Sequence, residues 1–322
     1  EAFDRLDGAS RELVQALSAV DTDASLSVLL SHRPEFVALW PQGFREVTIS
    51  GLNEVDCEEL ALELCDGELD DDELGWLARR AEGNPLHLIQ LLAFYRNNQV
   101  SEPPRAMADL IASRMGMMPA EIRSVLQAAA VAGEVVNGKT LTALCDIGDR
   151  ISQALAALVS RMFLVSAVDG HRFIHPYVRQ VVYTAIPAGI RAELHSRLAR
   201  HLSEFDSSPV LLAHHLWHSE EAREQSLPQL VAAGEWALSV MDEEGAAVSF
   251  RRALKLLPTP APEVTEPTLR SAWLRTIFGL TSTLARSGSR DEAKLLLDSA
   301  KDKAALAGWH VEAARLEVTS AL

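Results

Sequence analysis

The sequence has few of the features that mark secreted, membrane-spanning or nucleic-acid-binding proteins. It contains only three cysteines, Cys57, Cys65 and Cys145, and no CxxC pair. Three cysteines cannot all pair with one another, so we expect free, buried thiols and a reducing, cytoplasmic environment. No apolar run reaches the roughly 18 residues that a membrane-spanning helix needs, so membrane insertion is not expected.

Basic residues are also scarce. The 322 residues include 30 lysines and arginines against 45 aspartates and glutamates, which gives a formal net charge of −15. Proteins that bind nucleic acid usually carry a basic stripe, because counterion release drives that binding. The densest charge run, 66–73, is instead acidic, and we interpret it as a solvated loop and helix start, where the helix dipole favours carboxylates. Nucleic acid is therefore not expected as a partner of this segment.

The remaining composition is typical of a folded protein with more than one core. Hydrophobic residues make up 48% of the sequence and charged residues 23%, which argues against wholesale disorder. The length suggests about two or three domains. The first residue is Glu1 rather than methionine, and no basic, apolar leader follows it. We therefore expect an internal fragment of a longer polypeptide.

The segment 1–50 predicts the edge of an α/β layer. Two short strand candidates, 25–30 and 45–49, lie among helical patterns. Strands that alternate with helices are typical of such a layer.

The segment 51–105 is predicted to be helical. One helix stops at Gly83-Asn84, and Pro85 opens the next. Glycine suits a helix C-terminus and proline suits the first helical turn, so the break is physically consistent. The stretch 101–105 has two prolines and is interpreted as a linker.

The segment 106–187 predicts three short helices followed by a β-hairpin. Apolar residues at helical spacing mark the helices, and the pair Asp169-Gly170 stands between two short β-like runs, 163–165 and 172–174. An Asp-Gly pair in this position is a strong hairpin signal. Three helices and a hairpin make a winged-helix-like arrangement.

The segment 188–322 predicts helical hairpins of tetratricopeptide type. Small residues let paired helices approach and a proline closes the unit. The residues at these offsets are Gly234, Ala246, Phe250, Ala253 and Pro258. A second unit follows the proline-rich insert and a third begins near residue 309. The predicted fold class is thus mainly α, with the remnant of an α/β domain and a helical lid before the two helical modules.

Three segments together resemble one protein family. They are 31–36 (S-H-R-P-E-F), 83–88 (G-N-P-L-H-L) and 173–183 (F-I-H-P-Y-V-R-Q-V-V-Y). They are similar to the T-Y-R-P-E, G-N-P-L-F-L and F-x-H-x-L-V-R-x-A-V-Y motifs of bacterial signal-transducing ATPases with numerous domains. The chain order and the repeats that follow agree with the family, and the resemblance covers essentially the whole chain.

The resemblance implies a domain organisation and a nucleotide. Residues 1–50 would be the C-terminal part of an AAA-type ATPase core and 51–105 its lid, before the winged-helix-like domain (106–187) and the repeats (188–322). Glu1 would stand where the Walker B motif orients Mg²⁺, and Ala2 where the family has the acid that polarises water. A methyl group cannot accept a proton, so hydrolysis is in doubt.

The resemblance also implies nucleotide contacts further along the chain. Arg33 would sense the terminal phosphate, because a guanidinium offers a fork of charged donors. Gly83 and Pro85 would line the adenine site, Asn84 between them would belong to the same nucleotide site, and His175 would touch the diphosphate. Each of these residues has an alternative interpretation. Arg33 would be an ordinary surface arginine, Gly83 to Pro85 a plain break between two helices, and His175 a structural histidine.

No phosphate loop G-x-x-x-x-G-K-[ST] occurs in the sequence. ATP or ADP with Mg²⁺ is therefore expected only in the full-length parent, and this chain is not expected to bind ATP by itself. No self-contained catalytic site is predicted in this chain. The resemblance implies that the parent would carry an output such as a kinase, a cyclase or a DNA-binding domain, and the sequence does not identify which.

Two other sequence patterns concern zinc binding and DNA binding. His214 and His218 have the i, i+4 spacing of zinc ligands, but the intervening HExxH glutamate is replaced by His215, so we interpret them as helix histidines. The third helix of 106–187 has a single basic residue, Arg150, near its start, so DNA reading is not expected.

The sequence therefore predicts a regulatory and protein-interaction segment of a nucleotide-switched signalling ATPase. Its helical repeats would bind a protein partner or a small effector, and the family resemblance is compatible with a homo-oligomer. The alternative is an interaction scaffold with a degenerate, non-hydrolysing nucleotide site, for which Ala2 is the evidence.

Overall fold

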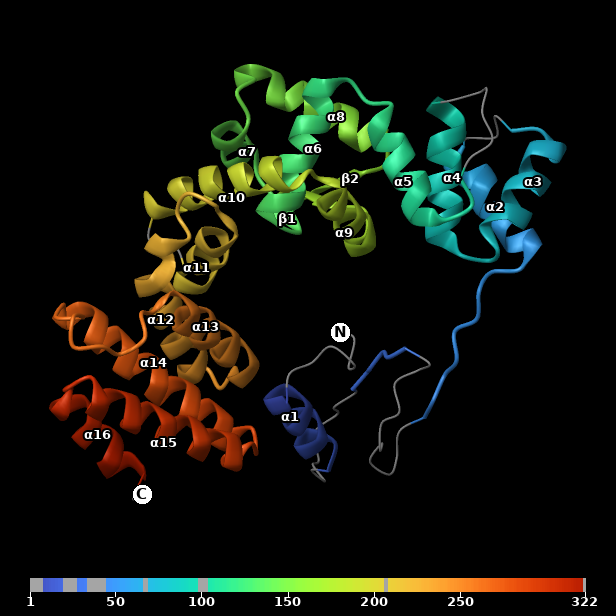
Figure 1. Cartoon of the computed structure of the whole chain (residues 1–322). Coiled ribbons are helices and arrows are strands. Elements are labelled where there is room, and N and C mark those ends of the chain that lie inside the picture. Colours follow the sequence, from blue (N-terminus) through green and yellow to red (C-terminus); the bar gives the residue numbers. More distant parts are fainter. Residues whose placement is uncertain are drawn as a thin grey trace. The chain divides into compact units, whose positions relative to one another are not determined.

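The computed structural model describes residues 8–19, 28–33, 45–65, 69–97, 104–205 and 208–320. These residues are mainly helical, as the sequence predicts (Figure 1). They form two compact units. The mixed unit comprises 48–206 and 218–220, and the repeat unit comprises 1–47, 207–217 and 221–322. No described helix combines the length and the apolar character that crossing a bilayer requires.

The mixed unit begins with a group of three helices, which keeps the name lid from the sequence prediction for 51–105. Its helices are α2 (Glu54–Leu64), α3 (Asp71–Ala81) and α4 (Pro85–Asn97). The side chains in its core include Cys57, Leu77, Leu88, Leu91 and Phe94. Asp70 caps α3 in a capping box with Glu73, so the acidic run does serve a helix start, where carboxylates stabilise the exposed N–H groups.

The lid is followed by five helices and a small three-stranded sheet. The elements are α5 (Met107–Gly116), α6 (Ala120–Ala132), β1 (Val135–Val136), α7 (Gly138–Leu144), α8 (Ile151–Ser160), β2 (Leu164–Ala167), β3 (Gly170–Phe173) and α9 (Pro176–Ala185). The sheet is antiparallel with the order β1-β3-β2. The predicted hairpin is confirmed, because Ala167 of β2 pairs with Gly170 of β3.

Gly170 is required at the hairpin for two reasons. Its φ of +138° lies in a region that side chains disfavour. A Cβ at this position would lie 2.3 Å from the carbonyl oxygen of Val136 in β1. The glycine therefore permits both the turn and the close pairing of β3 with β1.

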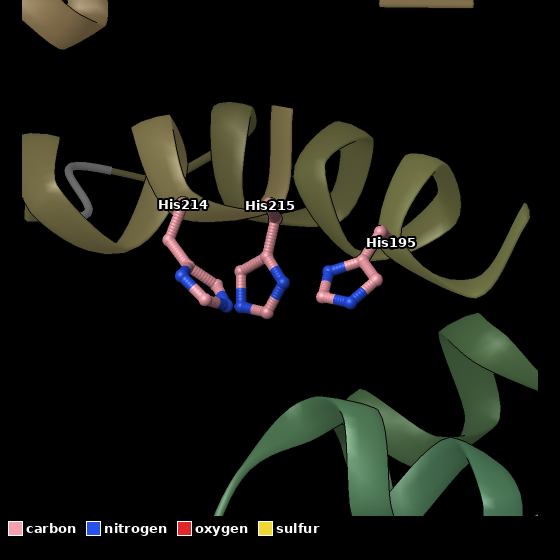
Figure 2. Close-up of side chains that lie close together, drawn as sticks. All are labelled: His195, His214 and His215. Atoms are coloured by element: carbon pink, nitrogen blue, oxygen red, sulfur yellow. The ribbon is translucent and has the colours of Figure 1, made fainter. Parts of the chain in front are cut away.

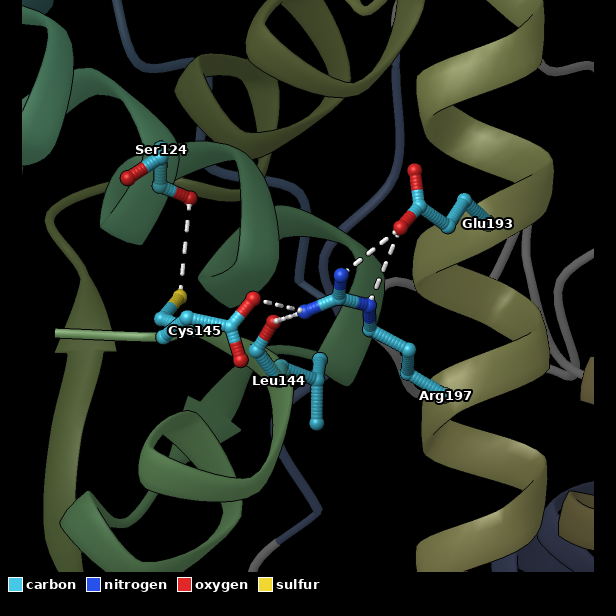
Figure 3. Close-up of polar contacts among 6 residues, drawn as sticks. Ser124, Leu144, Cys145, Glu193 and Arg197 are labelled. Atoms are coloured by element: carbon cyan, nitrogen blue, oxygen red, sulfur yellow. Dashed lines mark hydrogen bonds and ion pairs between the residues drawn. The ribbon is translucent and has the colours of Figure 1, made fainter. Parts of the chain in front are cut away.

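Helix α10 (Ala188–Ser203) completes the core of this module. Leu194 and Leu198 are buried with the residues of α6 to α9. Arg197 joins α10 to the end of α7, as Figure 3 shows. Its Nη1 donates to the carbonyl oxygen of Leu144 at 3.2 Å and to Asp146 at 2.9 Å, while its Nη2 donates to Glu193 at 2.7 Å. The module thus extends beyond residue 187, into the segment that the sequence pattern groups with the repeats.

The repeat unit contains paired helices. They are α11 (Pro209–His218), α12 (Leu227–Ser239), α13 (Glu243–Leu256), α14 (Pro267–Arg286), α15 (Arg290–Leu306) and α16 (His310–Ser320). Phe250 of α13 is fully buried. Its ring would lie 2.6 Å from a Cβ on Gly234 of α12 and 2.2 Å from one on Gly279 of α14. Two glycines therefore let three helices pack around one aromatic ring.

The predicted strand 45–49 is wrong. The described residues 45–50 are exposed and belong to no strand, with Val47 73% and Ile49 91% exposed. Their alternating apolar side chains do not cover a core, which a half-buried strand requires. For the candidate 25–30, residues 25–27 lie outside the described part and 28–30 form no strand. Before these segments the structure has α1 (Gly8–Ala19), and the predicted ATPase origin of 1–50 stays a prediction.

Candidate functional site

The turn between α3 and α4 holds three of the predicted nucleotide-site residues. Gly83 has φ +73°, and its carbonyl oxygen accepts a hydrogen bond from the Leu52 amide at 2.9 Å. A Cβ on Gly83 would lie 2.6 Å from the carbonyl oxygen of Leu52. Only glycine fits this left-handed, closely packed position without strain.

Asn84 and Pro85 start α4. The Oδ1 of Asn84 accepts hydrogen bonds from the amides of Leu86 at 3.0 Å and His87 at 3.2 Å. Pro85 is the first residue of the helix, where a missing N–H costs nothing. The helix break thus explains by itself why each of these positions has its residue type. A contact of Gly83, Asn84 or Pro85 with a nucleotide stays a prediction.

His175 is the N-cap of α9. Its Nδ1 accepts a hydrogen bond from the Tyr177 amide at 3.0 Å. The ring is exposed. With Nδ1 occupied as an acceptor, Nε2 is the nitrogen that remains for a ligand. His175 thus has a definite structural role, because it caps the start of α9. Its contact with a phosphate stays a prediction.

The other two predicted residues lie elsewhere. Glu1 is outside the described residues. Arg33 ends the described segment 28–33 of the repeat unit, and its side chain is exposed. Within the mixed unit, Gly83, Asn84 and Pro85 form one turn, whereas His175 stands at the start of a different helix.

A buried polar junction between the lid and the following module was not predicted from the sequence. Arg114 of α5 is only 5% exposed. Its Nη1 donates to Oε1 of Gln90 in α4, its Nη2 donates to the carbonyl oxygen of Arg161 after α8, and its guanidinium stacks on the Phe163 ring at 4.4 Å. Burial lowers the pKa of Arg114 to about 9. One charged side chain thus joins three separate segments.

A cavity opens at this junction. It has a volume of about 90 Å³ and is lined by Phe94, Arg114, Met117, Met118, Arg161 and Phe163. Gln90 is fully buried, and its Nε2 has no hydrogen-bond partner. The sequence does contain a signal for this junction. The charged residue Arg114 interrupts the apolar face of α5 that Leu110, Ile111 and Met115 form.

The histidines of the central region fall on two helices (Figure 2). His195 of α10 is buried, and its Nε2 shares a hydrogen bond of 2.9 Å with the Tyr183 hydroxyl. Its ring also lies 5.1 Å from that of His218. His214 and His215 are neighbours on α11, with ring centroids 5.1 Å apart and the rings nearly perpendicular. Of this pair, His215 is buried and His214 is exposed.

The repeat unit presents a polar pair between α12 and α14. Arg275 of α14 donates to Glu235 of α12 through Nε at 2.7 Å and through Nη2 at 2.5 Å. Both side chains are about half exposed. Trp236, the next residue on α12, is 47% exposed. Charged and aromatic groups are therefore available to a partner on these helices.

Comparison with known proteins adds a structural likeness. No family model matches the sequence, and no curated protein matches it. Among solved structures, the chain is similar to a Signal Transduction ATPase with Numerous Domains protein with a tetratricopeptide repeat sensor from Pyrococcus horikoshii, at 12% sequence identity and a TM-score of 0.46. The match covers 90% of this chain and 56% of that chain, so this chain spans little more than half of its length. A likeness at this level assigns no function, so we argue function from the contacts of the chain itself.

Proposed function

We propose that this chain is a regulatory, protein-interaction segment of a nucleotide-switched signalling protein. The observation that carries the proposal is the set of paired helices α12 to α16, of which α12, α13 and α14 pack around Phe250 through Gly234 and Gly279. Arrays of helical hairpins bury a continuous core and leave an extended surface, and such surfaces bind partners.

The exposed side of α12 and α14 supports an interaction role. Glu235 and Arg275 pair there, and Trp236 adds half-exposed aromatic area. Aromatic residues and arginines are enriched in protein interfaces, because they bury large areas and form directed hydrogen bonds. A protein partner or a small effector binds on this surface.

The module that precedes the repeats would transmit the binding event. Three helices and a hairpin form its winged-helix-like core, and α10 is held to that core by Arg197 and by Leu194 and Leu198. A rigidly attached helix transfers a displacement to the core it packs on, because packed interiors do not deform continuously. The buried contacts of Arg114 then continue from this module to the lid.

The nucleotide part of the proposal concerns the full-length protein. ATP or ADP with Mg²⁺ would be contacted there by Glu1, Arg33, Gly83, Asn84, Pro85 and His175. The exposed guanidinium of Arg33 and the uncommitted Nε2 of His175 are compatible with phosphate contacts.

A binding titration of the full-length protein tests the nucleotide part. Arg33→Ala should weaken ATP or ADP binding about tenfold or more, because a charge-assisted hydrogen bond contributes roughly 1.5–3 kcal/mol. Arg45→Ala is the matched control, since Arg45 is also an exposed arginine of this region. Unchanged affinity in Arg33→Ala would contradict the sensor role. A full-length protein that binds no nucleotide would favour the degenerate scaffold instead.

A charge reversal tests the interaction part. Arg275→Glu removes a surface ion pair and places two carboxylates together, but exposed pairs contribute only about 0–1 kcal/mol, so the fold should survive. It should weaken binding of a partner that is recovered with the full-length protein. Arg172→Glu on β3 provides an exposed control on a different element. If Arg275→Glu and Arg172→Glu bind the partner equally well, the surface of α12 and α14 is excluded as the partner-binding site.

A further inference from the structure

The junction between α4, α5 and the segment after α8 contains a buried positive charge without a carboxylate. Arg114 is 5% exposed, and within the described ranges its polar partners are Gln90 and the Arg161 carbonyl, neither of which is charged. Burying an ion normally costs several kcal/mol unless an opposite charge offsets it. The lowered pKa of Arg114, about 9, has this desolvation as its cause.

A second observation indicates an absent ligand. The Nε2 of Gln90 is buried and has no hydrogen-bond partner, although the Oε1 of the same side chain accepts from Arg114. Buried amide groups are almost always paired, because an unpaired donor loses its bonds to water without replacement. The polar group that holds Arg114 is thus itself incompletely hydrogen-bonded.

The cavity at the junction has the dimensions and the lining for a small anion. Its volume of about 90 Å³ exceeds what single water molecules need. Arg161 lines it together with Arg114, and the other lining residues, Phe94, Met117, Met118 and Phe163, are apolar. Pockets for nucleotides and drug-sized ligands have volumes of roughly 300–1,000 Å³, so this cavity is too small for ATP or ADP.

We propose that this cavity, the junction pocket, binds a small oxyanion of the phosphate type on Arg114, with Arg161 as the second guanidinium. The planar fork of a guanidinium matches the oxygens of phosphate, and the Phe163 ring fixes the orientation of the Arg114 fork. The oxyanion would balance the buried charge of Arg114, which Gln90 holds in place from α4. This site is separate from the residues to which the nucleotide role is assigned.

The position of the junction pocket gives the oxyanion a regulatory effect. Phe94 and Gln90 belong to the lid helix α4, whereas Arg114 belongs to α5, and Arg161 and Phe163 follow α8. A ligand that bonds groups from several segments stabilises their packing by mass action. Occupancy would therefore strengthen the attachment of the lid to the module that follows it.

Thermal unfolding in inorganic phosphate is the primary test. The protein is unfolded in sodium phosphate and in sodium chloride at equal ionic strength and pH, and the phosphate affinity is measured separately by calorimetry. At a phosphate concentration ten times the dissociation constant, we expect the melting temperature to rise by about 3 °C. The absence of any rise and of any binding heat would overturn the proposal.

Variants separate the junction pocket from general salt effects. Arg161→Gln removes a charge from the lining but leaves the backbone carbonyl that holds Arg114, so it should fold and bind phosphate at least tenfold more weakly. Arg161→Glu supplies a tethered carboxylate and should abolish the phosphate response. The control Arg172→Gln, on exposed β3, should keep the full response. Equal responses in all three variants would show an adventitious ion only, and would overturn the proposal.

An internal carboxylate is the competing explanation for the buried charge. Glu102 lies 12 positions before Arg114, in a stretch outside the described residues. If Glu102 neutralised Arg114, the unmodified protein would ignore phosphate and Glu102→Gln would respond to it. That pattern would refute the proposal, whereas equal phosphate responses of the unmodified protein and Glu102→Gln would support it.

Discussion

Gly279→Ala is expected to destabilise the repeat unit although alanine favours helices. The Cβ of alanine at this position would lie 2.2 Å from Cζ of Phe250, far inside the separation of about 3.5–4.0 Å at which carbon atoms attract. The ring cannot move towards α12 to make room. It is fully buried, and on that side a Cβ on Gly234 would already lie 2.6 Å from it.

Two opposing effects set the magnitude. Alanine in place of glycine in a helix gains about 1 kcal/mol. Overpacking a filled core costs about 1–3 kcal/mol, and the closeness of this contact places the cost at the upper end. The free energy of unfolding should therefore fall by about 2 kcal/mol. At Gly189 of α10, where a Cβ would meet no atom within 4 Å, the same replacement should instead stabilise by about 0.5–1 kcal/mol.

Urea unfolding measures both variants, followed by tryptophan fluorescence for Gly279→Ala and by far-ultraviolet circular dichroism for Gly189→Ala, because Gly189 lies in the mixed unit. Trp273 and Trp309 report on the repeat unit, because their buried rings stack edge-on with centroids 5.6 Å apart. Phe250→Leu in the Gly279→Ala background should recover part of the loss, because residues in contact are not additive. A Gly279→Ala protein as stable as the unmodified one would refute the proposed packing around Phe250.

Three further predictions concern groups in the mixed unit. Burial raises the pKa of the Cys145 thiol to about 11, so at pH 8 its thiolate is roughly 100-fold rarer than for an ordinary thiol and alkylation detected by mass spectrometry should require unfolding. Burial lowers the pKa of His87 below 6.5. As the pH falls from 7 to 5 the unfolded chain therefore takes up this proton before the folded chain does, which lowers the free energy of unfolding. Urea unfolding should show a smaller loss of stability over this pH range in His87→Gln than in the unmodified protein. Gly170→Ala should destabilise the hairpin by at least about 1 kcal/mol, measured by thermal unfolding, because of its φ of +138° and the nearby Val136 oxygen; an unchanged melting temperature would contradict that reading.

The elements that the sequence predicted best are those whose local and tertiary signals agree. The hairpin needs Gly170 for both its turn and its approach to β1, so the Asp-Gly pattern located it correctly. Phe250 likewise occupies the tetratricopeptide offset and is the centre of the observed packing. Its second glycine neighbour, Gly279, was not predicted, because the contact joins two repeats and no spacing within one repeat reveals it.

The misses arise where tertiary contacts decide. The alternation of 45–49 resembles a strand, but Val47 and Ile49 are exposed. Helix α10 has the same periodicity as the repeats, and only its contacts through Leu194 and Arg197 place it on the preceding module. Arg114 was overlooked because its partners are 24 and 47 positions away in the chain.

Hydrogen exchange of the full-length protein with and without ADP tests the central claim most directly. Coupling between the nucleotide site and the partner site is reciprocal. If partner binding on the repeats changes the affinity for nucleotide, nucleotide binding must also change the repeats. We predict that ADP changes the amide exchange of α9 and α10 and of the repeat helices α12 and α14. Bound ADP that leaves the exchange of all four helices unchanged would contradict a regulatory role for this chain.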